Sequence, residues 1–141
     1  NRHALNEQLA SLTEGQSLGV LYSDVMGLKQ INDTFGHQAG DKALLYACEN
    51  LKSHFPAECV YRIGGDEFLV LIPGITENLF QSMIRSIQAD MAEGSVHLAL
   101  GSVWVDCTDN AEKTLSEADA RMYEDKRAYY AKNRQLDRRR R

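Results

Sequence analysis

The chain has 141 residues, a formal net charge of −4, and 43% hydrophobic and 26% charged residues. These values are ordinary for a globular fold, and the length fits one domain. The acidic balance argues against broad nucleic-acid binding, which needs basic surface to neutralise phosphates. No apolar run approaches the ~20 residues that span a bilayer, and the polar start lacks a signal-peptide pattern. We therefore expect a cytoplasmic domain, which can belong to a larger, even membrane-anchored, protein.

The first half of the chain contains helical and strand patterns. Leu5, Leu9 and Leu12 recur at helical spacing and predict a helix over 4–12. The short apolar run 18–24 (LGVLYSD) predicts a strand that ends in a carboxylate. Two further helices are expected over 29–35 and about 39–55, because Gly36 separates them and Pro56 follows the second.

The second half begins with a predicted hairpin. Strands over 59–63 and 68–72 flank a Gly-Gly pair, which is typical of a tight turn. An amphipathic helix around 80–91, a strand over 96–105 and a last helix over about 111–131 follow. Helices interleaved with a hairpin-bearing sheet indicate an α+β sandwich, with a mostly antiparallel central sheet flanked by helices.

The turn of the hairpin carries the first candidate site residues. Gly64 and Gly65 have no side chain, so a phosphate or a base can approach the main chain there. Asp66 and Glu67 follow directly, and adjacent residues at the start of a strand point to opposite faces. One carboxylate can then bind a metal while the other takes a second role. An ordinary hairpin turn with solvated acids is the alternative.

Asp24, at the end of an apolar strand, is the second candidate acid. Strand ends commonly carry catalytic acids. If the strands of Asp24 and Asp66 are neighbours, the two carboxylates can share one divalent cation. Hard oxygen ligands favour Mg²⁺, which keeps waters and substrate phosphates in its other positions. This arrangement is typical of nucleotidyl transfer, in which the metal polarises the phosphate.

The segment 28–41 (LKQINDTFGHQAGD) is rich in polar residues. An Asn and an Asp can together read guanine, because an amide donates and accepts while a carboxylate accepts from ring N–H and amino groups. The segment offers Lys29, Asn32, Asp33, His37 and Asp41. Taken alone, each polar residue in this segment is more typical of a helix cap or a turn than of a binding site.

The sequence resembles the GGDEF family of diguanylate cyclases. Three motifs occur in the family's order and spacing, and the opening Asn1-Arg2 resembles the end of the family's entry segment. The motifs are SDVMGLKQINDTFGHQAGD at 23–41, RIGGDEF at 62–68 and ADARMYEDK at 118–126. The resemblance implies a palm-like fold similar to adenylyl cyclase catalytic domains, and an excised domain (1–133) followed by a basic tail or linker (134–141). It also implies a homodimer that condenses two GTP into cyclic di-GMP with Mg²⁺ or Mn²⁺, controlled by an upstream sensory or dimerisation domain.

The resemblance assigns roles by position. Asp24 and the carbonyl of Val25 match metal ligands, and Asp66 matches an acid that binds metal and accepts a proton. The resemblance also implies that Glu67 assists with the metal or the 3′-hydroxyl and that Lys29 stabilises the transition state. Asn32 and Asp41 match residues that read guanine, and His37 matches a position that faces the substrate. Gly64 and Gly65 leave room for the substrate, and Lys126 matches a contact to the triphosphate.

The chain departs from the family pattern in three places. Met26 stands where Asp or Asn is usual, which we expect to weaken the metal site without abolishing it. Tyr130 stands where a cation usually follows Lys126, so a phosphate contact is lost. Residues 55–58 do not match the RxxD product-inhibition motif, so we predict no such site. Met26 and Tyr130 support an alternative hypothesis, a degenerate domain that binds GTP or a protein partner without turnover, whereas the intact turn and Asp24 oppose it. A purely structural domain is a third interpretation.

Overall fold

The computed structural model of the protein describes residues 2–140, and their side chains as far as residue 134. Asn1, and the side chains of the predicted basic tail beyond residue 134, lie outside the described residues. The elements in chain order are α1 (Arg2–Ala10), β1 (Leu18–Val25), α2 (Leu28–Phe35), α3 (His37–His54), the 3₁₀ turn η1 (Ala57–Cys59), β2 (Val60–Arg62), β3 (Glu67–Pro73), α4 (Glu77–Glu93), β4 (Leu98–Val105) and α5 (Ala111–Arg140).

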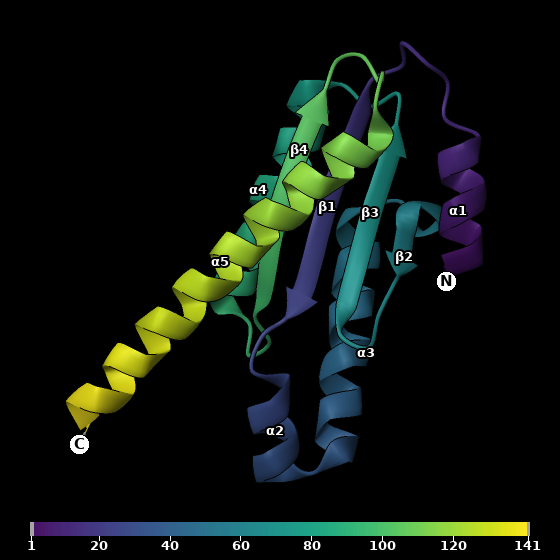
Figure 1. The fold of residues 1–141 in the computed structure, drawn as a ribbon. Coiled ribbons are helices and arrows are strands. Elements are labelled where there is room, and N and C mark those ends of the chain that lie inside the picture. Colours follow the sequence, from purple (N-terminus) through teal and green to yellow (C-terminus); the bar gives the residue numbers. More distant parts are fainter. Residues whose placement is uncertain (1, 141) are drawn as a thin grey trace.

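A single four-stranded sheet organises the described chain, with strand order β2-β3-β1-β4 (Figure 1). Every neighbouring pair is antiparallel. The predicted hairpin is confirmed, and Arg62 of β2 lies opposite Phe68 of β3. The central strand β1 pairs with β3 in a register that sets Asp24 opposite Glu67. The predicted α+β fold with an antiparallel sheet is therefore correct.

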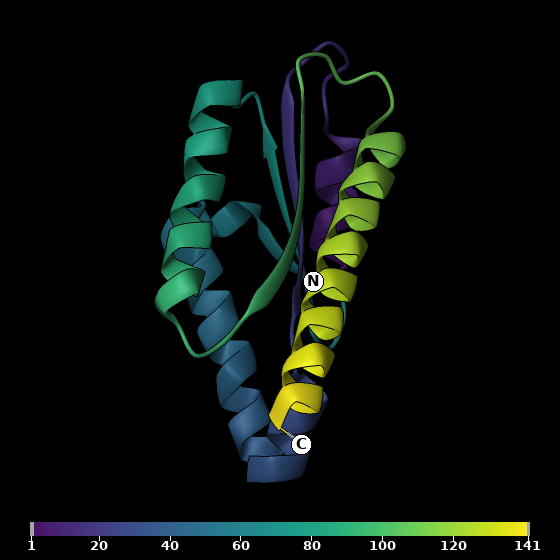
Figure 2. The ribbon, with the colours of Figure 1, turned by 90° about the vertical axis from the view of Figure 1, so that its left-hand side faces the viewer.

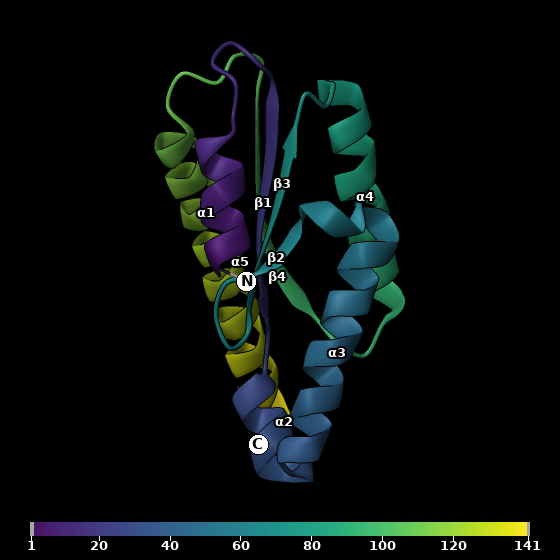
Figure 3. The same cartoon turned by 90° about the vertical axis from the view of Figure 1, so that its right-hand side faces the viewer.

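Helices cover both faces of the sheet. Figures 2 and 3 show α3 and α4 on one face and α1 and α5 on the other. Successive residues of β1 serve the two layers, because side chains of a strand alternate between faces. Leu21 and Val25 belong to the cluster under α3 and α4, whereas Val20 belongs to the cluster under α1 and α5. Asp24 follows Val20 at even spacing and therefore points toward α5.

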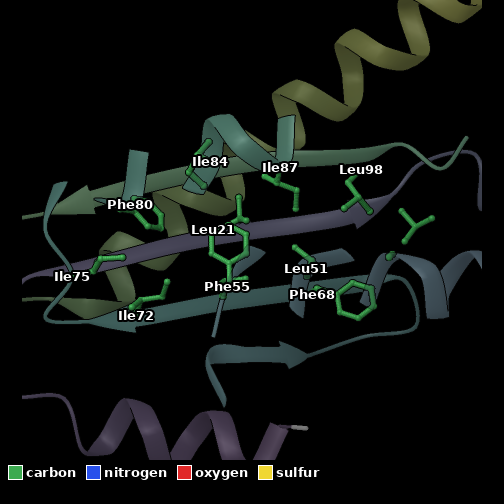
Figure 4. Packing of buried hydrophobic residues seen from close by; sticks show 13 residues of the cluster. Leu21, Leu51, Phe55, Phe68, Ile72, Ile75, Phe80, Ile84, Ile87 and Leu98 are labelled. Carbon is green, nitrogen blue, oxygen red and sulfur yellow. The ribbon is translucent and has the colours of Figure 1, made fainter. Parts of the chain in front are cut away.

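The larger core lies between the sheet and the α3–α4 layer. Figure 4 shows Phe55, Phe68 and Phe80 packed among aliphatic side chains from β1, β3 and both helices. Each of these aromatic rings is at most 3% exposed. Burying a large apolar side chain contributes roughly 1.5–3 kcal/mol, so this layer is a main source of stability for the sheet.

Helix α5 rests on β4 at a glycine. A Cβ on Gly101 would lie 2.1 Å from the backbone atoms Ala118 O and Met122 N, so only a glycine admits the helix this closely. Two α5 side chains then satisfy the free edge of β4. Asp125 accepts a hydrogen bond from Leu100 N (2.9 Å), and Arg121 donates to Ser102 O (2.6 Å). This contact fixes where α5 crosses the sheet, and it also covers an otherwise open strand edge.

The last helix is longer than the sequence pattern predicts. The expected end near residue 131 is wrong, because α5 continues to Arg140. No glycine or proline follows Gly101 in the sequence, so no residue breaks the helical backbone. The residues expected to form a basic tail from 134 thus continue α5 as far as 140. The domain boundary at residue 133 stays a prediction.

Candidate active site at the end of strand β1

Asp24 is the most deeply placed acid of the candidate site. It is 2% exposed at the end of β1. Its Oδ2 accepts a hydrogen bond from Lys126 Nζ at 2.7 Å, which joins the strand to α5. Its other oxygen, Oδ1, is buried without a hydrogen-bond partner among the described residues. A buried carboxylate oxygen with no partner is costly, and it marks a position where a cation or a donor from a ligand fits.

The pairing of β1 with β3 brings Asp66 beside Asp24. The N–H of Val25 donates to the carbonyl of Asp66 at 3.0 Å, directly beyond the Asp24–Glu67 pair. Burial raises the pKa of Asp24 to about 6; the hydrogen bond from Lys126 opposes this, and the neighbouring Asp66 carboxyl adds to it. The same bond to Asp24 raises the pKa of Lys126. The two acids predicted to lie together are therefore neighbours in the fold.

The donors at this end of the sheet suit a magnesium-type ion. Among the described residues, no group of three or more histidine, cysteine, aspartate or glutamate side chains is close enough to form a protein-only cage. Mg²⁺ commonly uses one or two carboxylates and completes its shell with waters and substrate phosphates. Asp24, with its unpartnered oxygen, and Asp66 fit this requirement.

An arginine that the sequence reasoning passed over holds the Gly-Gly turn. The Arg62 guanidinium donates to the carbonyl of Gly64 at 3.3 Å and to that of Gly65 at 2.6 Å. The N–H groups of Ile63 and Gly64 donate to Glu67 O at 3.0 and 3.4 Å and close the loop. In the sequence, the only signal for this role of Arg62 is its place just before the Gly-Gly turn. The glycine turn is thus held in one shape beside the acids.

The Glu67 side chain lies beneath the turn. Its Oε2 is 3.3 Å from the position that a Cβ on Gly64 would take. Because Glu67 pairs with Asp24 across the strands, the two side chains share a face of the sheet. The charge of Glu67 also raises the pKa of Tyr22 on that face, where burial is the larger cause. The expectation that Asp66 and Glu67 point to opposite faces, with different roles, stays a prediction.

Met26 packs beneath α5, on the side of the sheet where Asp24 also meets this helix. It is 3% exposed and packs in a small cluster with Ala99 and Met122. Its N–H donates to the carbonyl of His97 at 2.8 Å, which ties the end of β1 to the start of β4. The structure therefore gives this departure from the family pattern a packing role. Its expected effect on the metal site stays a prediction.

Tyr130, the second departure, contacts the loop after β1. The N–H of Gly27 donates to the Tyr130 hydroxyl at 3.2 Å. Gly27 has a φ of 69°, a left-handed conformation that favours glycine, and it caps the start of α2. Lys126 and Tyr130 are one helical turn apart, so from one face of α5 they reach the end of β1 and the loop that follows it. In the sequence, only the four-residue spacing of Lys126 and Tyr130 indicates that the two side chains lie on one face of the helix.

The candidate guanine readers lie on α2 and α3. Asn32 packs against α3 so closely that its Oδ1 would be 1.8 Å from a Cβ on Gly40, and this oxygen is buried without a partner among the described residues. Asp41 is exposed and lines a cavity of about 250 Å³ with Arg62 and Phe68. The structure thus brings Asp41 beside the hairpin, while Asn32 lies at the helix–helix contact.

The remaining predicted residues are on the surface. Lys29 near the start of α2 and His37 at the start of α3 are both exposed. No hydrogen bond or ion pair of either side chain occurs within the described part of the chain. They are free to meet a ligand, although the structure does not join them to Asp24 and Asp66.

Comparison with known proteins identifies this arrangement. Residues 1–132 match the family described as "Diguanylate cyclase, GGDEF domain". The chain is 35% identical over 130 residues to "Probable diguanylate cyclase DgcI" of Escherichia coli K12, covering 89% of this chain and 29% of that protein. It is 36% identical over 99 residues to "Cyclic di-GMP phosphodiesterase PdeB" of Shewanella oneidensis, covering 69% of this chain and 12% of that protein.

A solved structure of a microbial GGDEF domain, described in terms of its interaction with cyclic di-GMP, is also similar. Its TM-score is 0.73 at 29% identity, covering 90% of this chain and 82% of that one. An antiparallel palm with acids at the end of its central strand thus defines the class. The chain belongs to the GGDEF domain family, whose relatives include named diguanylate cyclases. No helix among the described residues combines the length and apolarity needed to cross a membrane.

Proposed function

We propose that this domain is a diguanylate cyclase, which condenses two GTP into cyclic di-GMP and releases two pyrophosphates. The observation that supports this most is the meeting of Asp24 and Asp66 beside the turn pinned by Arg62. Asp24, Asp66 and the carbonyl of Val25 are the proposed ligands of Mg²⁺ or Mn²⁺. The chemistry supplied by such an ion is charge neutralisation at the α-phosphate.

The residues of the chain divide the other tasks. Asp66 accepts the proton of the attacking 3′-hydroxyl, and Glu67, opposite Asp24 across the strands, assists. The exposed ammonium of Lys29 stabilises the charge that develops in the transition state. Lys126 contacts the triphosphate, which requires it to leave Asp24. Asp41 and Asn32 read guanine, His37 borders the substrate, and Gly64 and Gly65 leave room for it.

The reaction needs two copies of the domain. Each copy binds one GTP, and the two hairpins face each other across a two-fold axis, so that each 3′-hydroxyl attacks the α-phosphate held by the partner. An upstream segment that dimerises the chain then controls activity. The chain spans 29% or less of the first three curated relatives, which leaves room for such a segment in proteins of this kind.

A second candidate is a domain that binds GTP or a protein partner without turnover. It is favoured by Tyr130, which places a hydroxyl where a cation is usual, and by the relative named as a phosphodiesterase. The intact acids, Asp24 and Asp66, oppose it.

The test is product formation by the domain fused to a dimeric coiled coil, incubated with radiolabelled GTP and Mg²⁺. Cyclic di-GMP that forms with the wild-type fusion and disappears with Asp66→Asn supports the cyclase. The exposed acid Glu58, exchanged for Gln, is the matched control and retains activity. GTP binding without product, in a fusion shown to be dimeric, supports the second candidate and contradicts the first.

A further inference from the structure

One side of α5 carries a row of side chains that begins at the acidic site. Lys126, Tyr130 and Arg134 follow one another at intervals of one helical turn and therefore share a face. Together with Tyr123 and Arg127 they border a shallow cavity of about 470 Å³. Figure 1 shows that α5 crosses the sheet and continues beyond the end of β1. The row thus leads from Asp24 outward, past the edge of the sheet.

The first two members of the row are already engaged. Lys126 donates to Asp24 at 2.7 Å, and the Tyr130 hydroxyl accepts from Gly27 N at 3.2 Å. Tyr130 is neutral, so it offers no positive charge to an anion. The next cation on this face after Lys126 is therefore Arg134, two turns farther along the helix.

Arg134 is exposed and uncommitted. No hydrogen bond or ion pair joins it to any of the described side chains, which end at residue 134 itself. Side chains on a helix lean toward its N-terminus, so the Arg134 guanidinium lies over the turn of Tyr130, on the side of the acids. A planar guanidinium also matches phosphate oxygens in a bidentate manner.

The negative charges of the acids favour a position of the nucleotide's phosphate tail near this row of side chains. Asp24, Asp66 and Glu67 gather negative charge at the end of the sheet, so phosphates that are not held by a cation are repelled from it. The nearest surface with fixed positive charge on the α5 side contains Lys126, Arg127 and Arg134. Arg127 is partly engaged, since its Nη1 lies 3.5 Å from Glu124 Oε1.

We infer that Arg134 binds the terminal phosphates of the nucleoside triphosphate, one turn beyond the position at which Tyr130 replaces a cation. This inference rests on the proposed function, because it assumes that a nucleotide lies at the acids. It assigns the row Lys126, Tyr130 and Arg134 to the polyphosphate tail, not to the base or the ribose. The phosphate-binding surface of this chain is accordingly displaced along the extended helix.

The test compares two ligands that differ in their phosphate tails. Binding of GMP and of the α,β-methylene analogue of GTP, which cannot release pyrophosphate, is measured with Mg²⁺ on the full chain. We expect Arg134→Gln to weaken binding of the triphosphate analogue about 5- to 10-fold, the range of a solvent-exposed charge-assisted contact, and to leave GMP unchanged. Arg134→Lys should restore part of the loss, because it keeps the charge without the planar fork.

Lys132 offers a matched control. It is exposed, lies two residues from Arg134 and therefore points to a nearly opposite side of α5, where it borders a different cavity with Met91 and His97. Lys132→Gln removes the same charge and should leave both affinities unchanged. Equal losses of affinity for Lys132→Gln and Arg134→Gln, or no loss for either, overturn the inference. The proposed function is not contradicted in that case if the wild-type chain still binds the triphosphate analogue. A wild-type chain that binds neither ligand overturns both.

Discussion

The two regions that meet at the candidate site are built differently. The acidic end of the sheet contains Asp24, which is 2% exposed and held by β3 on one side and α5 on the other. The helical arm, which we define as α2 with residues 37–42 of α3, lies beyond the end of the sheet in Figure 1. Helix α2 has no buried residue at all, and Lys29, His37 and Asp41 of the arm are exposed.

The proposed catalytic acids lie in the first region, and the proposed guanine readers lie in the second. The acids are set by strand register, so moving Asp24 relative to Asp66 requires breaking a paired sheet above a close-packed core. Within the arm, α2 packs on the start of α3, where Asn32 meets Gly40, and α3 then continues from the arm into the layer that covers the sheet. A region with few buried contacts can adjust its position at low free-energy cost. We therefore expect exchanges at the sheet end to stop turnover and exchanges in the arm to shift nucleotide preference.

The largest expected contrast in activity is between the same exchange, aspartate to asparagine, at two positions. Asp24→Asn should lower cyclic di-GMP formation by the dimer-fused domain at least 100-fold, because the buried carboxylate with the unpartnered oxygen loses its charge. Asp41→Asn, on the exposed arm, should retain turnover within about tenfold while the preference for GTP over ATP falls by about tenfold, the value of one lost hydrogen bond to a charged group. Rates of product formation with GTP and with ATP measure both the turnover and the nucleotide preference. A similar loss of rate from both variants would abolish the proposed division.

Gly101→Ala should give the largest loss of stability. The added methyl meets the backbone of α5 at 2.1 Å, and backbone atoms cannot move aside as a flexible side chain can. Helix α5 must shift, which also strains the bonds from Arg121 and Asp125 to β4. We expect a loss of about 3 kcal/mol or more in urea unfolding, at the upper end of overpacking effects. The neighbour Ser102→Ala, whose side chain points to the other face, should change stability by less than about 0.5 kcal/mol. Equal effects would contradict this role of Gly101.

Gly40→Ala tests the arm in the same way and should cost less. The added methyl meets the Asn32 amide, a side-chain group that can rotate away, so we expect a loss of about 1–2 kcal/mol. Asn32→Ala removes the obstacle, and the double variant should therefore recover most of the loss caused by Gly40→Ala in a double-mutant cycle of urea unfolding. Strictly additive losses would show that Asn32 and Gly40 are not in contact in solution.

Much of the fold follows from patterns visible in the sequence. The alternation of strands and helices, the hairpin around Gly64-Gly65 and the position of Asp24 at the end of a strand all come from periodicity and turn chemistry, which are local. The end of α5 was missed because a helix without a breaker continues as far as its surroundings allow. Periodicity marks only the face that packs on the sheet, and that face ends earlier.

The finer parts of the site could not be read from the sequence because they depend on long-range contacts. Lys126 and Asp24 are 102 residues apart, and Tyr130 and Gly27 are 103 residues apart. Neither partnership leaves a local pattern in the chain. Arg62 was within reach of inference, since it directly precedes the turn that it holds. Met26 shows the reverse case, because its position in the motif predicts an effect on the metal site, whereas the fold gives it a packing role with Ala99 and Met122.

The smallest expected effect concerns the response of the metal-free chain to pH. Burial raises the pKa of Asp24 from 3.8 to about 6, so between these values the folded chain holds more protons than the unfolded chain. Stability from this group is therefore complete below pH 3.8 and is lost as the pH rises through 6. In urea unfolding with EDTA, the stability of Asp24→Asn relative to wild type should rise by about 1 kcal/mol or more from pH 4 to pH 7. Other carboxylates cancel in this difference, since both proteins contain them. A difference that is flat or falls with pH would mean that the Lys126 ammonium compensates fully for the burial of Asp24, and that the sheet end does not favour a proton or a metal ion at this oxygen.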